Sequence, residues 1–235
     1  MIIAVVGAGG KTTLGNFIGK SLANMNRRVL FTTTTKIFMP ANTPVYLGAA
    51  EAIRPLGAFM TASKEVLSSG KLTGYCPDEI DAIASTGLFE DIIVEADGAA
   101  RKPVKAPNET EPVYPAADLI IGVIGLDCIG LPVNDQNVHR AALFAGVTQA
   151  SFDEPVTAQH ILRLISHSEG LFRHAPASIP RVVFLNKCDT IDEKIQLQVD
   201  EIVCRSPYPV MITGYAVNWF EAFALRFLQG DSHAH

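Results

Sequence analysis

The sequence lacks the features that mark several classes of protein. It has only four cysteines (Cys76, Cys128, Cys188 and Cys204), and they form no Cys-x-x-Cys or Cys/His cluster of the kind that binds zinc. No apolar run approaches the length of a membrane span, and no basic leader precedes the first apolar run. The formal net charge of -5 disfavours a nucleic-acid-binding surface. We therefore expect a cytoplasmic α/β protein without a membrane or nucleic-acid partner.

The most informative stretch is residues 1–13. An apolar run is followed by a glycine-rich segment, then by Lys-Thr-Thr and an apolar-periodic segment over residues 14–25, which predicts strand, loop and helix. Such a loop points backbone N–H groups at an anion. Lys11 would contact the outer phosphates of a nucleotide, and the Thr12 hydroxyl would bind Mg²⁺. The predicted nucleotide-binding residues are Gly7, Ala8, Gly9, Gly10, Lys11, Thr12 and Thr13.

The loop departs from the usual phosphate-loop pattern at one position. Val5 stands where that pattern has its first glycine, and the short loop resembles that of the Mur ligases. The alternative is an ordinary glycine-rich turn between a strand and a helix. The dinucleotide pattern G-x-G-x-x-G does not fit, because Thr12 follows Gly7 and Gly9 where a glycine is needed. The Lys-Thr pair therefore favours a triphosphate.

Alternation of apolar strands with helices predicts the fold. We expect one domain over residues 1–235 with a three-layer, P-loop NTPase-like fold, in which helices cover both faces of a mostly parallel sheet. Ligands bind such sheets beyond the carboxyl ends of the strands. The expected strands are 27–35, 45–47, 58–61, 91–95, 119–125, 181–185 and 209–212, and the expected helices are 14–25, 49–53, 77–85, 137–145, 157–166, 192–204 and 219–228, with a long loop over 101–115.

Carboxylates and hydroxyls follow two of the expected strands. Glu95 and Asp97 come after the short apolar run 92–94, which is the pattern of a Walker B strand, and they are predicted to bind Mg²⁺ or polarise water. Thr34 and Thr35 end the second strand, where they would hold a metal-bound water or the γ-phosphate. The alternatives are an acidic turn and the ordinary preference of threonine for strands. The predicted catalytic residues are Lys11, Glu95 and Asp97.

Residues 186–189 read Asn-Lys-Cys-Asp and follow another buried strand. In GTPases this pattern recognises guanine, because the aspartate accepts from the base N1–H and exocyclic amine. Asn186, Lys187 and Asp189 are therefore predicted to bind the base, which favours GTP over ATP. The alternative is a polar turn in which Asp189 or Thr190 caps the next helix.

Basic residues gather in the predicted loops. Arg101, Lys102 and Lys105 are interleaved with prolines, and Lys36 ends the threonine run. These cations, together with His139 and Arg140, are predicted to contact an anionic substrate or a client. A solvated basic loop and a structural histidine are the alternatives.

Taken together, these motifs resemble those of the YqeC family across nearly the whole chain. The resemblance rests on residues 7–13, 32–36, 95–107, 111–113, 139–140 and 186–189. It implies a small nucleotide-binding protein that acts as an accessory factor for selenium-dependent molybdenum hydroxylases. A hydroxylase or its molybdenum cofactor would then be the client.

Three functions fit these residues. The first is a slow Mg²⁺-dependent GTPase or other NTPase whose two nucleotide states control contact with a client. The second is an ATP-dependent ligase or transferase that activates a small acid as an acyl phosphate, which the Mur-like loop and basic segment suggest. The third is a non-hydrolysing chaperone for a molybdopterin-type cofactor.

Overall fold

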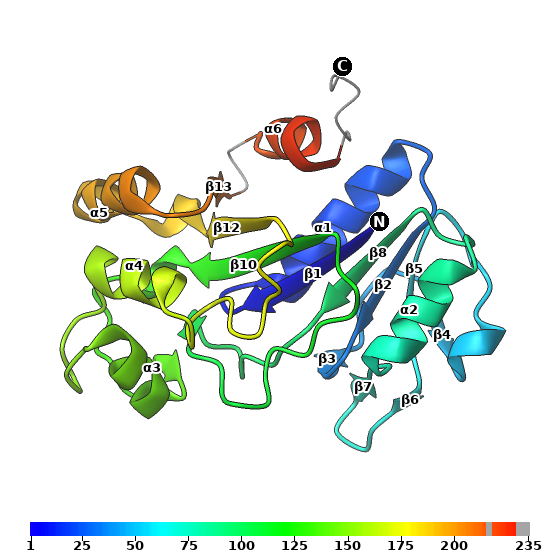
Figure 1. The fold of residues 1–235 in the computed structure, drawn as a ribbon, viewed down its shortest axis with the longest axis horizontal. Helices are drawn as coiled ribbons and strands as arrows, with labels where there is room; N and C mark the ends of the chain where they lie inside the picture. The colour runs from blue at the N-terminus through cyan, green and yellow to red at the C-terminus, as the bar shows by residue number, and fades with distance from the viewer. Residues whose placement is uncertain (215–217, 229–235) are drawn as a thin grey trace.

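A computed structural model describes residues 1–214 and 218–228 and shows an α/β fold built on one large parallel sheet (Figure 1). The sheet has eight strands in the order β13-β12-β10-β1-β8-β2-β5-β4, and every neighbouring pair is parallel. The strands are β1 (Ile2–Gly7), β2 (Val29–Thr33), β4 (Val45–Leu47), β5 (Phe59–Ser63), β8 (Asp91–Glu95), β10 (Leu119–Gly125), β12 (Arg181–Asn186) and β13 (Val210–Thr213).

Two smaller sheets flank the large one. The first is antiparallel and has the strand order β3-β7-β6, with β3 (Lys36–Phe38), β6 (Glu65–Val66) and β7 (Lys71–Thr73). The second pairs β9 (Val104–Lys105) with β11 (Val138–His139) in parallel. The strands of both small sheets follow strands of the large sheet in the sequence. The chain enters them from the carboxyl edge of the large sheet.

Helices cover both faces of the large sheet. Apolar side chains of α1 (Lys11–Asn24) and α6 (Phe220–Phe223) belong to one core cluster. Those of α2 (Pro77–Ser85), α3 (Ala141–Thr148), α4 (Ala158–Ser166) and α5 (Glu193–Arg205) belong to the other. Short 3₁₀ turns lie at Ala50–Ala52, Leu126–Cys128 and Cys188–Thr190, and a π-helical segment, Ala224–Leu228, follows α6.

The central strand β1 shows why the strands read as unbroken apolar runs. Ile2, Ala4 and Val6 face the cluster that contains α2 to α5, whereas Ile3 and Val5 face the cluster that contains α1. A strand between two helical layers buries both of its faces, so alternation with polar residues is lost. The same reasoning predicted the parallel sheet, and the structure confirms it.

The register of the strands brings the predicted motifs to one edge. Val5 pairs with Glu95, and Glu95 pairs with Thr33 on the other side. Further along the sheet, Asn186 lies between Gly125 and Thr213. Several loops therefore start at neighbouring positions along the carboxyl edge, namely those after β1, β2, β8, β10 and β12.

Several predicted boundaries were wrong for local reasons. The helix expected over 137–145 starts at Ala141, because residues 138–139 form β11 and Arg140 is left-handed with φ 63°. The strand expected over 27–35 ends at Thr33. Part of the long loop over 101–115 forms β9. The expected helix over 219–228 is α-helical only at Phe220–Phe223.

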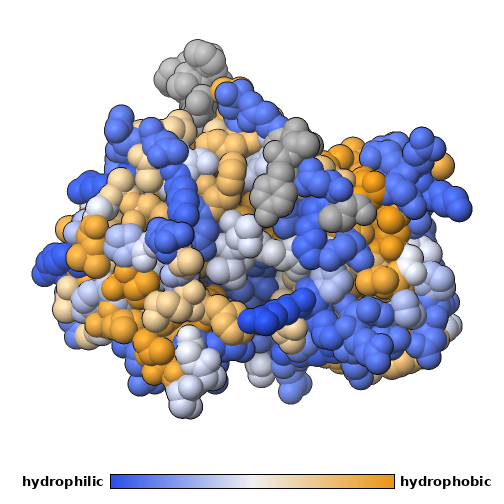
Figure 2. Space-filling model, turned by 180° about the vertical axis from the view of Figure 1, so that it is seen from behind, coloured by the Kyte–Doolittle hydropathy of each residue, from blue (hydrophilic) through white to orange (hydrophobic). Residues whose placement is uncertain are grey.

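The surface seen in Figure 2 mixes hydrophilic and hydrophobic residues. Among the described helices, none is both long enough and apolar enough to cross a bilayer.

Candidate functional site

The glycine loop joins β1 to α1 at the centre of the sheet. Gly7, Gly9 and Gly10 have φ angles of 92°, 84° and 119°, a region that side chains other than glycine rarely adopt. A Cβ atom on Gly9 would also overlap the backbone of Gly125, and one on Gly10 would overlap the Asn186 amide. The glycines are thus required both by backbone conformation and by close packing.

The loop divides into two functional parts. The N–H groups of Gly7, Ala8 and Gly9 donate within the protein, to Asp97 Oδ2 (3.0 Å), Val123 O (2.9 Å) and Lys102 O (3.1 Å) respectively. In contrast, the first turn of α1 at residues 11–13 offers N–H groups that have no acceptor within the helix. The surface able to receive an anion is therefore the second half of the predicted loop, residues 10–13, which line a cleft.

Lys11 is a buried cation held between two carboxylates. Its Nζ atom donates to Gly7 O (2.7 Å) and lies 3.2 Å from Asp97 Oδ1 and 3.5 Å from Glu95 Oε1. Burial alone would lower the pKa of the Lys11 ammonium, but the charges and hydrogen bonds of Asp97 and Glu95 outweigh it and hold that pKa above its usual value. The lysine therefore stays charged at neutral pH.

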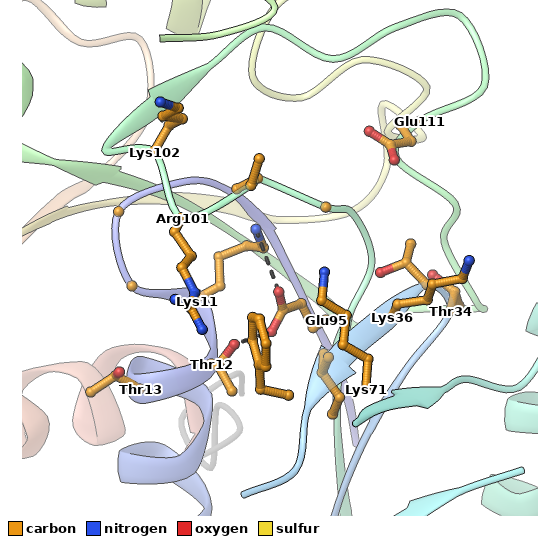
Figure 3. Close-up of a pocket in the computed structure, with 18 of the residues that line it drawn as sticks. Lys11, Thr12, Thr13, Thr34, Lys36, Lys71, Glu95, Arg101, Lys102 and Glu111 are labelled. Atoms are coloured by element: carbon orange, nitrogen blue, oxygen red, sulfur yellow. Dashed lines mark hydrogen bonds and ion pairs between the residues drawn. The ribbon is translucent and has the colours of Figure 1, made fainter. Parts of the chain in front are cut away.

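The two predicted carboxylates occupy different positions. Glu95 lines the cleft, and its Oε2 accepts from the Thr12 hydroxyl at 2.6 Å (Figure 3). Burial and the nearby Asp97 charge hold the pKa of Glu95 above its ordinary value despite Lys11 and Thr12. Asp97 is only 1% exposed and supports the loop through Gly7. Of the two, Glu95 is the one placed to meet a ligand.

Lys105 lies inside the protein, away from the loop surface on which it was expected. Its side chain is 2% exposed, and its ammonium lies 2.8 Å from Asp97 Oδ2 and 3.1 Å from Glu111 Oε2. Arg140 Nη1 contacts the same Glu111 oxygen at 2.7 Å. Charge pairs thus run from Lys11 through Asp97, Lys105 and Glu111 to Arg140. The geometry assigns Lys105 to this network.

Of the other residues predicted to contact a substrate or client, some line the cleft and some do not. Lys36, Arg101 and Lys102 line the cleft. Arg140 binds Glu111, and His139 is half-buried at the end of β11. Burial and neighbouring cations hold the pKa of His139 below its usual value. Neither His139 nor Arg140 lines the cleft, although Arg140 contacts Glu111, which does.

The threonine run contacts mainly backbone. Thr33 Oγ1 donates to Glu95 O at 2.6 Å, and Thr34 Oγ1 donates to Val113 O at 3.0 Å. Thr35 Oγ1 lies 3.2 Å from Thr33 Oγ1. Thr34 and Thr35 line the cleft, and the Thr33 hydroxyl and the Thr34 N–H both donate to Glu95 O, which joins the ends of β2 and β8.

The Asn-Lys-Cys-Asp segment meets the glycine loop. Asn186 Nδ2 donates to Gly9 O at 2.8 Å, and Thr213 Oγ1 donates to Asn186 Oδ1 at 2.9 Å. Lys187 Nζ lies 2.6 Å from Asp127 Oδ2. A hollow of about 440 Å³ opens beside this segment and is lined by Gly10, Thr13, Leu14, Phe17, Asn186, Lys187, Asp189, Thr213, Gly214 and Trp219.

The main cleft has a volume of about 820 Å³ and a strongly cationic lining. Figure 3 shows Lys11, Thr12 and Glu95 gathered in this cleft, with Lys71 and Arg101 entering it from other segments. Two carboxylates, Glu95 and Glu111, line it, against six cations: Lys11, Lys36, Lys71, Arg101, Lys102 and Lys187. Sequence reasoning missed Lys71 and Phe38, because no motif marks them and only the pairing of β3 with β7 brings them here.

Fold and site together define an α/β protein with a glycine loop and a cationic cleft at the carboxyl edge of a parallel sheet. A sequence model described as "YqeC protein" matches residues 3–142. The chain is also 34% identical over 203 residues to the "Uncharacterized protein YqeC" of Escherichia coli strain K12, across 83% of this chain and 78% of that protein. The protein belongs to the YqeC family.

Replacement of Lys105 tests the buried network. We expect Lys105→Met to lower the free energy of unfolding by about 3–5 kcal/mol, because Asp97 and Glu111 would remain buried without their shared cation. Lys194→Met removes an exposed lysine from α5 and should change stability by less than about 0.5 kcal/mol. Urea unfolding measures both values, and equal stabilities of the two variants would contradict the network.

The pH dependence of stability tests Glu111. Burial opposes ionisation of this carboxyl, but Arg140 and Lys105 lower its pKa from 4.5 to about 2. The folded-state pKa is the lower one, so the stabilisation should be complete above pH 4.5 and lost as pH falls toward 2. At about 1.4 kcal/mol per pKa unit, it amounts to roughly 3 kcal/mol at neutral pH.

The measurement compares urea unfolding of wild type and Glu111→Gln from about pH 7 to about pH 3. The stability difference should shrink as the solution becomes more acidic. Glu109→Gln, an exposed change in the same loop, serves as the control. A wild-type advantage that is constant with pH would contradict the assigned ionisation.

Proposed function

We propose that this protein binds a magnesium nucleoside triphosphate, with GTP preferred, and hydrolyses it slowly. The observation that carries the proposal is the part of the cleft where the start of α1 and the buried Lys11 ammonium meet Glu95. A polyphosphate is the common ligand that matches both a cationic cleft and a glycine loop opening a helix.

The arrangement of strands supports a P-loop NTPase-like fold. The loop follows β1, and the adjacent β8 ends in Glu95, so loop and carboxylate meet at neighbouring strand ends. Thr12 and Glu95 touch as a phosphate loop and a Walker B acid would. In this proposal the backbone of residues 10–13 and the Lys11 ammonium bind the phosphates.

The donor set fits Mg²⁺. Thr12 Oγ1 and Glu95 Oε2 lie 2.6 Å apart and offer a hydroxyl and a carboxylate, which are hard oxygen ligands. No cluster of three or more metal-binding side chains occurs among the described residues, so phosphate oxygens would complete the coordination. When bound, Mg²⁺ would neutralise charge on the phosphates.

The protein's contribution to hydrolysis would be positioning and charge compensation. Water attacks the γ-phosphorus, the bond to the bridging oxygen breaks, the electron pair leaves with the nucleoside diphosphate, and the proton of the water is released with the phosphate product. Lys11 would have to leave Gly7 O and turn toward the phosphates, where its positive charge opposes the developing negative charge. Asp97 would hold the loop in place through the Gly7 N–H.

The hollow beside Asn186 is suited to the base. It adjoins the main cleft, since both are lined by Gly10, Thr13 and Lys187. Its apolar lining includes Leu14, Phe17 and Trp219, against which a flat ring can pack. Asp189 lies on its polar side, where a carboxylate would accept from guanine and disfavour adenine.

A second candidate is an ATP-dependent ligase or transferase, and one observation favours it. The cleft continues past Glu95 to Lys36, Lys71 and Arg101, which leaves room for a co-substrate. An accessory role in maturing a selenium-dependent molybdenum hydroxylase remains a proposal based on family membership. Nucleotide turnover that requires an added small acid would favour the ligase over the GTPase.

The first test removes the phosphate-binding ammonium. Lys11→Ala should lose about 1.5–3 kcal/mol of nucleotide binding, roughly a tenfold to hundredfold rise in Kd, because a charge-assisted contact disappears. Lys20→Ala removes an exposed lysine from the same helix and should leave Kd unchanged. Calorimetric titration with Mg²⁺ and a non-hydrolysable GTP analogue, on variants shown to be folded, measures the difference. Equal affinity in both variants would reject the site.

The second test addresses the choice of base. In Asp189→Ala, GTP affinity should fall by about 1–3 kcal/mol, because the guanine donors lose a charged acceptor, whereas ATP affinity should stay the same. Glu193→Ala removes a nearby exposed carboxylate and serves as the control. Competition between GTP and ATP measures the discrimination. A wild type that prefers ATP would contradict the guanine assignment.

A further inference from the structure

The main cleft extends well beyond the segment suited to phosphates. At one end it shares Gly10, Thr13 and Lys187 with the base-sized hollow. Past Lys11, Thr12 and Glu95 it is lined by β3, by Lys71 of β7 and by residues 98–102. A nucleotide lying from the hollow to Glu95 would leave this second part of the cleft open. It therefore offers space next to the terminal phosphate.

Two cations contact one aromatic ring in this part of the cleft, and a third, Lys36, lines the cleft as well. Lys71 Nζ lies 4.9 Å from the centroid of the Phe38 ring, and the Arg101 guanidinium carbon lies 4.3 Å from it. Lys36 belongs to the same strand as Phe38, and Phe38 is 43% exposed. Cation–π contact orders both charged groups without neutralising them.

These cations lack the carboxylate partners that two other cleft cations have. Lys11 is paired with Glu95 and Asp97, and Lys187 with Asp127. Among the residues that the structure describes, Lys36, Lys71 and Arg101 form no ion pair with a carboxylate. Like charges repel when they share one small space, so an anionic ligand would relieve an unfavourable interaction there.

The backbone that carries Arg101 is also unusual. Ala100 and Arg101 are both left-handed, with φ angles of 47° and 62°, and neither is a glycine. Consecutive residues in this region are unfavourable and persist when the surrounding structure fixes them. This conformation directs the Arg101 side chain over Phe38, into the cleft.

We propose that Lys71 and Arg101, which contact Phe38, form with Lys36 a second anion-binding subsite for the carboxylate or phosphate group of a small co-substrate. The subsite deepens the proposed nucleotide function, on which its role beside the terminal phosphate rests. A group held there would lie on the far side of Thr12 and Glu95 from the base hollow. Its affinity should depend on Lys71 and Arg101, and not on Lys11.

The test is a calorimetric titration of inorganic phosphate, and separately of acetate, into protein saturated with Mg²⁺ and a non-hydrolysable GTP analogue. One site should appear for at least one of the two anions, and which anion binds identifies the group preferred. In the double variant Lys71→Met/Arg101→Met the Kd should rise by more than about tenfold, because two charged contacts are lost. Nucleotide affinity should stay within about twofold of wild type.

A matched control separates the subsite from general electrostatics. Arg28→Met/Lys64→Met also removes two positive charges, from exposed residues outside the cleft lining, and should leave the anion Kd unchanged. An equal loss in both double variants, or no binding of either anion to wild type, overturns the subsite.

Failure of the nucleotide proposal gives a different result. If wild type binds no nucleotide, the anions are titrated into the protein alone. Binding that is lost in Lys71→Met/Arg101→Met and kept in Lys11→Ala then supports the subsite, while the nucleotide proposal fails. Binding that is lost only in Lys11→Ala overturns the subsite.

Discussion

Charge compensation around the buried Lys11 ammonium is the interaction on which the site depends. Glu95 and Asp97 together hold that ammonium, while Asp97 also accepts from the Gly7 N–H and pairs with Lys105. The glycine loop, the end of β8 and the segment over 98–111 are thereby fixed by one set of charges. Isolated buried charges are very unfavourable, so none of these groups can be changed without affecting the others.

This arrangement was predictable where it follows from strand direction. Apolar runs such as residues 2–6 and 92–94 indicated strands buried on both faces, and parallel strands bring their carboxyl ends to one edge. The meeting of Lys11 and Thr12 with Glu95 follows from that rule alone. The part of the site that could be predicted is the part built directly on the ends of adjacent central strands.

The rest depends on contacts that local sequence does not encode. Lys105 lies in a polar, proline-containing segment, which predicts an exposed side chain. It is buried instead, because its ammonium pairs with Asp97 and Glu111. Lys71 reaches the cleft only through the short pairing of β7 with β3, and strands of three residues carry too little periodicity to be recognised. Arg140 has a positive φ, so α3 begins only at Ala141. Arginine rarely adopts this backbone conformation, so tertiary contacts must fix it.

The hydrogen bond from Asn186 to Gly9 has a consequence for the order in which the protein matures. Gly9 leaves the ribosome early, but the amide that supports its carbonyl, and the Thr213 hydroxyl that orients this amide, are synthesised much later. Nascent chains fold from the N-terminus as they emerge. The Gly9 carbonyl therefore gains this support only after β12 and β13 have joined the sheet. In a nascent chain that lacks these strands, the glycine loop is without this hydrogen bond.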